Sequence, residues 1–146
     1  MKPLLVQFLT IFMFLFSVSI NAQTLEELLK GGDQLVMEFK NKEALDVYNN
    51  ANQKFPNNWE VLWRISRAYV DIGEHMPDKT DEQQDAQSET YQKAFDYADK
   101  SVTLAPDQAI TYVRRAIANG YAAHFLSTLP KRLGPLIAPM RFSAAI

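Results

Sequence analysis

Cysteine is absent from the 146 residues, and glycine and histidine are scarce, with five and two copies. Without thiols, no disulfide can hold the fold and no thiolate can serve as a nucleophile or a metal ligand. The two histidines, His75 and His124, form no recognisable catalytic pattern with a serine or a carboxylate, and the glycines form no phosphate-binding loop. The sequence therefore predicts a protein that is not an enzyme, needs no cofactor and is held together by apolar packing alone.

Acidic residues are also absent after Asp107, so charge is divided unevenly along the chain. The span from Glu26 to Asp107 holds all 17 acidic residues but only nine basic ones, a net charge of −8. A nucleic-acid-binding protein would carry a basic face across its fold. This distribution therefore predicts no nucleic-acid partner.

One acidic segment contains side chains of the kind that bind metal ions. Asp71, Glu74, His75, Asp78 and Asp81 lie close together in the sequence. Their spacing matches no zinc-binding helix motif and no calcium-binding loop. We therefore expect a solvated loop here and no metal site.

A long apolar run occurs at the N-terminus. Lys2 precedes an apolar stretch from Leu4 to Ile20, and small or polar residues follow as far as Ala22. This is the layout of a secretory signal peptide, which predicts cleavage after Ala22 and a periplasmic or secreted protein. The alternative is an uncleaved anchor, because the run is near the lower length limit for spanning a bilayer. Only in that case would a membrane be a partner.

Two stretches fifty residues apart, 42–58 and 92–108, resemble each other. In each, a small residue opens an amphipathic run and a proline ends it. Self-similarity of this kind indicates a repeat protein whose helix pairs must stack to bury their apolar faces. The matching pairs are Ala44 and Ala94, Asp46 and Asp96, Ala51 and Ser101, and Pro56 and Pro106.

Apolar periodicity and capping residues predict five helices. Capping boxes at Thr24 with Glu27 and at Thr80 with Gln83 open the first and the fourth. Gly73 is expected to end the third helix, and three prolines, Pro130, Pro135 and Pro139, to prevent a regular helix near the C-terminus. The expected ranges are 25–39, 42–55, 59–71, 81–104 and 108–126.

This pattern resembles the tetratricopeptide repeat, whose unit is 34 residues. The resemblance places Gly32, Tyr48, Ala51, Ser66 and Ala98 where the helices of a pair or of neighbouring repeats touch. The fifty-residue offset is then one period plus a 16-residue acidic insertion. The resemblance implies an all-α, α-solenoid-like array of about two and a half antiparallel helix-pair repeats. The domain would span residues 23–126 after a signal peptide at 1–22, with the insertion at about 73–90 and an irregular basic, apolar tail at 127–146.

A narrower resemblance rests on WEVLWRISRAYVDIGE, the acidic insertion and YADKSVTLAPDQAITYVRRAIANG. Together these are similar to the repeat domain of the regulator of microtubule dynamics proteins and their exported bacterial relatives. An exported chain would meet no microtubule, so the family name does not indicate the ligand. The chain departs from this family after about Phe125, where the family continues with further helices.

The tetratricopeptide resemblance implies a concave groove, lined by the first helix of each repeat, that binds a peptide or a partner protein. Trp63 and Arg67 lie four residues apart on one helix face and can reach one ligand. The alternative is that Trp63 belongs to the core between repeats and that Arg67 is solvated or ion-paired. The groove positions are Asp33, Val36, Met37, Trp63, Arg67, Val70, Val113 and Ile117.

Two functions remain open at this point. The first is an exported scaffold for protein–protein interaction that binds a partner segment in its groove. The second is a structural subunit that pairs, as a homo-oligomer or with another chain, through the incomplete repeat at its C-terminal end, because terminal repeats normally carry a polar capping helix.

Overall fold

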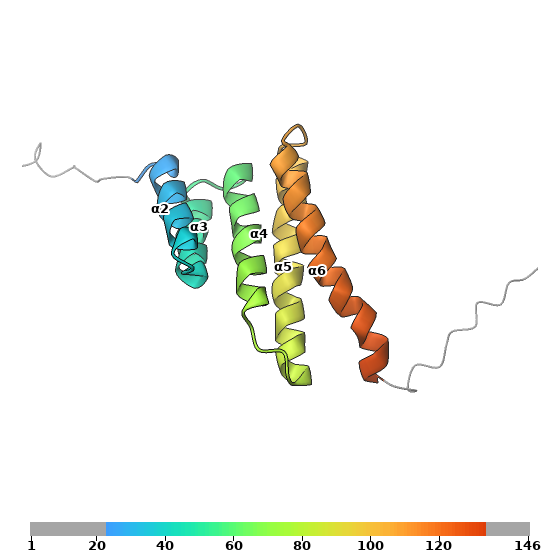
Figure 1. Ribbon diagram of the computed structural model, residues 1–146. Coiled ribbons are helices and arrows are strands. Elements are labelled where there is room, and N and C mark those ends of the chain that lie inside the picture. Colours follow the sequence, from blue (N-terminus) through green and yellow to red (C-terminus); the bar gives the residue numbers. More distant parts are fainter. Residues whose placement is uncertain (1–22, 134–146) are drawn as a thin grey trace, which may run out of the picture.

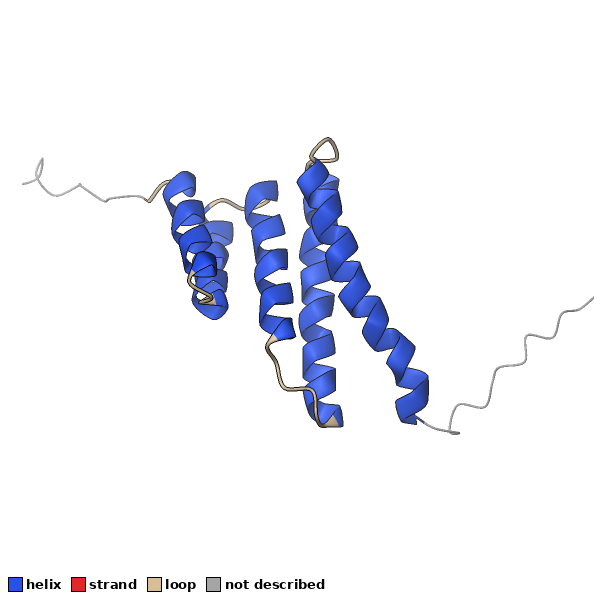
Figure 2. Ribbon diagram, viewed as in Figure 1, coloured by secondary structure: helices blue, strands red, loops and turns tan. Residues whose placement is uncertain are grey.

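The computed structural model describes residues 23–133 and, within them, the side chains up to His124 (Figure 1). The described residues form helices joined by short loops and contain no strand, as Figure 2 shows. This confirms the predicted all-α fold. The predicted signal peptide and the chain after Leu133 lie outside the described residues. The helices are α2 (Leu25–Met37), α3 (Asn41–Lys54), α4 (Trp59–Glu74), α5 (Asp81–Leu104) and α6 (Ala109–Leu133).

The helices form two antiparallel pairs followed by a single helix. The first pair is α2 with α3, the second is α4 with α5, and α6 packs against both α4 and α5. In the view of Figure 1, α3 lies behind α2 and α5 lies partly behind α6, so that α2, α4 and α6 form a front layer. The first helix of each predicted unit therefore contributes to one face of the molecule.

Both predicted capping boxes are present. Thr24 Oγ1 accepts a hydrogen bond from the Glu27 amide at 3.2 Å, and the Glu27 carboxylate accepts one from the Thr24 amide at 2.9 Å. Thr80 and Gln83 form the same reciprocal pair at the start of α5. Each box satisfies backbone donors that the first helical turn leaves without a partner.

The 16-residue insertion is distributed over three parts of the second pair. Helix α5 has 24 residues against 14 in α3, and α4 has 16 against 13 in α2. The loop between α4 and α5 has six residues, 75–80, where the first pair has three, 38–40. These differences of ten, three and three residues account for the whole insertion, so the rest of the two pairs keeps a 34-residue offset.

Gly73 does not end α4, contrary to expectation. It is buried inside the helix, which continues to Glu74, and a methyl group at this position would overlap the ring of Tyr91 in α5. The Gly73 carbonyl also accepts a hydrogen bond from Gln87 Nε2 at 2.9 Å. The glycine is therefore explained by close packing of the lengthened helices rather than by helix termination.

Helix α6 is longer than expected at its C-terminal end. It runs to Leu133, so residues 127–133 of the predicted irregular tail are helical and Pro130 lies within the helix. Proline removes one backbone hydrogen bond and crowds the preceding turn. In a helix of 25 residues this local loss near the end is compatible with continued helical geometry.

Small residues at the predicted contact positions allow the helices to pack closely. The side chains of Ala44, Ala51, Ser66, Ala94 and Ala98 are all fully buried. Two groups of apolar residues result, one joining α2, α3 and α4 and the other joining α4, α5 and α6. This continuous packing replaces the disulfides that the chain cannot form.

Candidate partner-binding surface

The predicted groove residues come from α2, α4 and α6, which together form the front layer in Figure 1. Their exposure differs widely. Met37 on α2 is 82% exposed and Ile117 on α6 is 37% exposed, so both are available to a partner. Val70 on α4 is only 6% exposed and packs with Ala94, Ala98 and Ala118. The expectation that Val70 faces a ligand is therefore corrected: it belongs to the core.

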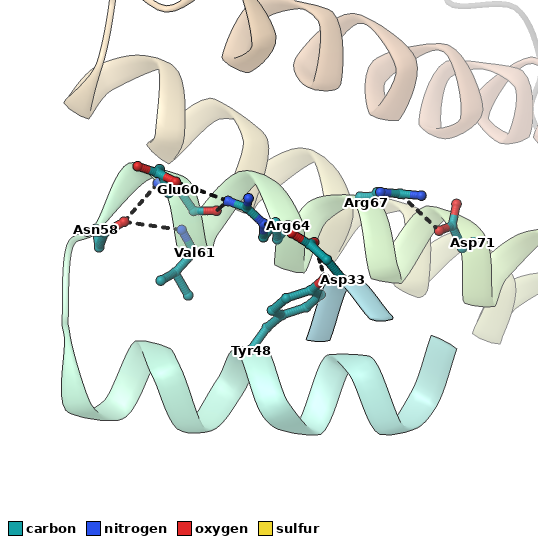
Figure 3. A network of polar contacts seen from close by, with 8 residues as sticks. All are labelled: Asp33, Tyr48, Asn58, Glu60, Val61, Arg64, Arg67 and Asp71. Atoms are coloured by element: carbon teal, nitrogen blue, oxygen red, sulfur yellow. Dashed lines mark hydrogen bonds and ion pairs between the residues drawn. The ribbon is translucent and has the colours of Figure 1, made fainter. Parts of the chain in front are cut away.

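Asp33 lies at the centre of a network that joins α2, α3 and α4 (Figure 3). Its Oδ1 accepts a hydrogen bond from the Tyr48 hydroxyl at 2.7 Å, and both of its carboxylate oxygens lie 3.1 Å from Arg64 Nε. Arg64 is also paired with Glu60 at 3.3 Å, one turn before it on α4. Asp33 was predicted to face a ligand, but here it binds two side chains of its own domain.

Burial and the Asp33 carboxylate act together on Tyr48. Burial raises the pKa of the Tyr48 hydroxyl, and the hydrogen bond to Asp33 raises it further. The hydroxyl therefore stays protonated and donates throughout the physiological range. Since Tyr48 also packs its ring on Gly32, this bond fixes the ring at the point where α2 and α3 touch.

A cavity of about 510 Å³ opens beside this network, between α2 and α4. Asp33, Glu60 and Arg64 lie on one side of it, and Leu25 and Leu29 supply its apolar wall. This hollow lies at the N-terminal end of the predicted groove. It combines apolar and charged surface, as a site for a peptide side chain requires.

Trp63 is half-buried on α4 and is flanked by two guanidinium groups. The guanidinium carbon of Arg64 lies 4.3 Å from the indole centroid, and that of Arg114 on α6 lies 5.6 Å away. Both distances are in the range of cation–π contacts. Part of the indole nevertheless remains exposed, so Trp63 is neither a fully buried core residue nor an isolated surface residue.

Arg67 lies next to Trp63 on α4 and forms an ion pair with Asp71. Its Nε is 3.6 Å from Asp71 Oδ2, which is too long for a hydrogen bond (Figure 3). Burial raises the pKa of the Asp71 carboxyl group, and the charges of Arg67 and then Arg114 oppose that increase. One carboxylate therefore faces two arginines.

Arg114 and Arg64 were not predicted as site residues. Arg114 is half-buried, and no described group accepts a hydrogen bond from its buried Nε. Burial lowers the pKa of its guanidinium, and repulsion from Arg67 adds to the decrease. The spacing of Glu60 and Arg64, four residues apart on a helix, is the one sequence signal that indicated an ion pair at Arg64.

A second hollow lies on the opposite side of α6. It has a volume of about 560 Å³ between α5 and α6, and its walls include Phe95, Tyr112 and Ala116. Arg115 pairs with Asp99 at 3.1 Å across the same hollow. This is the face on which the second helix of a third repeat would pack.

The described residues offer no site for a metal ion and no membrane span. Between residues 23 and 133, no three histidine or carboxylate side chains are grouped so that they could hold a metal ion. His75 instead places Nδ1 2.7 Å from the Asp71 carbonyl oxygen. None of the helices in this range is both long and apolar enough to cross a bilayer.

Comparison with known families bears on the whole helical array. The family model described as Regulator of microtubule dynamics protein 1-3 matches residues 28–133. The chain belongs to this family. The regulator of microtubule dynamics match begins in α2 and ends with the last residue of α6, so it includes the insertion and extends beyond Phe125, where we expected the resemblance to end. No curated protein matches the chain.

Proposed function

We propose that the chain is an exported tetratricopeptide-type scaffold that binds an extended segment of a partner protein on the face formed by α2, α4 and α6. The observation that carries this proposal is Trp63, a large aromatic side chain held half-exposed between arginines of α4 and α6. Tryptophan and arginine are the residue types that most often dominate the energy of protein interfaces. The groove is a binding surface and not a catalytic one.

Three further features support the proposal. The two helix pairs keep a 34-residue offset, and small residues are buried at matching positions such as Ala44 and Ala94. The hollow beside Asp33 continues the same face toward α2. The N-terminal segment, with Lys2 before an apolar run that ends near Ala22, favours export to the periplasm or outside the cell.

Peptide selection tests the proposal. Random peptides displayed on phage are selected against the purified full-length protein, and the affinities of enriched peptides are measured by fluorescence polarisation. We expect Trp63→Ala to weaken binding of the enriched peptides by about tenfold or more, as for a residue at the centre of an interface.

Tyr112→Ala is the matched control for this experiment. Tyr112 is also an exposed aromatic residue, 41% accessible, but it lies on the hollow between α5 and α6. It should leave the affinity unchanged, and both variants should retain the circular dichroism spectrum of the parent. Enriched peptides that bind equally well to the Trp63→Ala variant would show that this face is not the binding site.

A second candidate function, assembly through the C-terminal end, is favoured by the hollow between α5 and α6. Helix α6 exposes Tyr112, Val113 and Ile117, which an internal repeat would cover with a further helix. If two chains pair there, light scattering after size-exclusion chromatography should give a dimer mass at micromolar concentration, and Tyr112→Glu should convert it to a monomer. A parent protein that already elutes as a monomer would contradict this function.

A further inference from the structure

The contact between α4 and α6 contains a local excess of positive charge. We call Trp63, Arg67, Asp71 and Arg114 the arginine seam. It contains two guanidinium groups and one carboxylate, although residues 26–107 as a whole carry a net charge of −8. A basic spot within an acidic domain stands out because the surrounding charge does not explain it.

The arginines on this face differ in how well they are paired. Arg64 is 14% exposed and is paired with two carboxylates, those of Asp33 and Glu60. Arg67 has only a long contact with Asp71. Arg114 forms no ion pair with any described side chain, and its buried Nε has no acceptor there. Burying an unpaired charge costs free energy unless a partner of opposite charge arrives.

The seam has the geometry to receive one anionic group. Arg67 and Arg114 approach from two helices closely enough to repel each other, and Trp63 supplies a flat surface beside them. A carboxylate placed between the two guanidinium groups would relieve that repulsion and accept charge-assisted hydrogen bonds. Arginine presents donors in a fixed planar fork that suits a carboxylate.

The surroundings of the seam favour a peptide over a polyanion. Ile117 lies one helical turn after Arg114 and remains 37% exposed, and Val113 beside it is 50% exposed. These offer apolar contact next to the charge. A nucleic acid or an anionic membrane would be repelled by the acidic body around the seam, whereas a segment with a single acidic residue would not.

We propose that the arginine seam recognises one aspartate or glutamate of the partner segment, flanked by apolar residues. This inference rests on the proposed function, because it names the chemistry of the segment bound there. Arg67 and Arg114 hold the carboxylate, Trp63 packs against the adjoining part of the segment, and Asp71 limits the positive charge while the site is empty.

Three peptide pools test the inference. They share random flanking positions and differ only at a central residue, which is Glu, Gln or Lys, and each is passed over the immobilised full-length protein. We expect about tenfold more peptide to be retained from the Glu pool than from the Gln pool, as for the loss of a charge-assisted contact. Added salt should reduce this preference.

Charge variants identify the residues responsible. Arg67→Gln and Arg114→Gln should abolish the preference for Glu, and Arg114→Lys should restore part of it. Arg115→Gln is the matched control, because Arg115 follows Arg114 in the sequence but pairs with Asp99 on the other side of α6; it should keep the preference. Asp71→Asn should increase it, since it removes the one competing carboxylate. Urea midpoints of all variants show whether each is folded.

The outcomes separate this inference from the proposed function. Equal retention of the Glu and Gln pools, with binding still dependent on Trp63, would overturn the inference and leave the scaffold standing. Retention of no pool at all would contradict both. Phosphatidylglycerol vesicles that bind in an Arg114-dependent way and displace the Glu pool, when phosphatidylcholine vesicles do not, would assign the seam to lipid and overturn the peptide assignment.

Discussion

Replacing Gly32 with alanine is expected to destabilise the domain by about 2 kcal/mol, while the same replacement at the adjacent Gly31 should stabilise it by up to about 1 kcal/mol. A methyl group on Gly32 would overlap the ring of Tyr48, whereas one on Gly31 would meet nothing within 4 Å. Both substitutions gain helix propensity, so their difference isolates the packing term.

The Tyr48 ring has no alternative position that would relieve the overlap. It is fully buried, and its hydroxyl is held by Asp33 at 2.7 Å. Adding volume to a closely packed interior forces side chains out of their preferred rotamers or moves the backbone. The α2–α3 contact must therefore open when Gly32 is replaced.

Urea unfolding followed by far-ultraviolet circular dichroism measures both effects. A lower midpoint for Gly32→Ala and a higher one for Gly31→Ala is the expected pattern. Equal midpoints for the two variants would mean that α2 and α3 are not in close contact at Gly32, and the arrangement of the first pair would need revision.

Replacing Asp33 with alanine is expected to cost about 2 kcal/mol of unfolding free energy, after allowance for the partial exposure of its carboxylate. The change removes the acceptor of Tyr48 and one of the two carboxylates paired with Arg64, whose side chain is only 14% exposed. It therefore leaves a largely buried positive charge less well compensated.

Asp46→Ala is the control for this prediction. Asp46 has the same side chain and lies exposed on α3, so its replacement should change stability by less than about 0.5 kcal/mol. A double-mutant cycle of Asp33→Ala with Tyr48→Phe should give a coupling energy clearly different from zero. Additive effects in this cycle would contradict the network of Figure 3.

The repeat register alone predicted why Gly32 is a glycine. Its position relative to Ala44 indicated a close contact between two helices, and Tyr48 provides that contact. The same reasoning missed Gly73, because Tyr91 lies in the part of α5 added by the insertion and has no counterpart in the first pair. Periodicity reveals contacts that recur and is silent about contacts that occur once.

The side chains of the binding face were harder to predict than the helices that carry them. Helical spacing placed Asp33, Trp63 and Arg67 on the front layer, but it could not show that Asp33 is engaged by Tyr48 and Arg64. Nor could it show that Arg114 approaches Trp63 from a helix some fifty residues away. Such contacts depend on how the pairs stack, which is a property of the tertiary structure.

The boundaries of the helices illustrate the same limit. Local signals located the starts of α2 and α5 correctly, because capping boxes act within four residues. The end of α6 was misplaced because Pro130 was interpreted as a helix breaker, although a proline near the end of a long helix removes only one hydrogen bond.

The most direct test of binding on the α2, α4 and α6 face is to map a selected peptide onto the protein by nuclear magnetic resonance. Full-length protein labelled with nitrogen-15 is titrated with a peptide enriched by display. The account predicts the largest shift changes at the Trp63 indole and at neighbouring amides of α4 and α6, with little change along α3. Changes concentrated on α3 and on the outer side of α5, with the Trp63 signal unmoved, would contradict it.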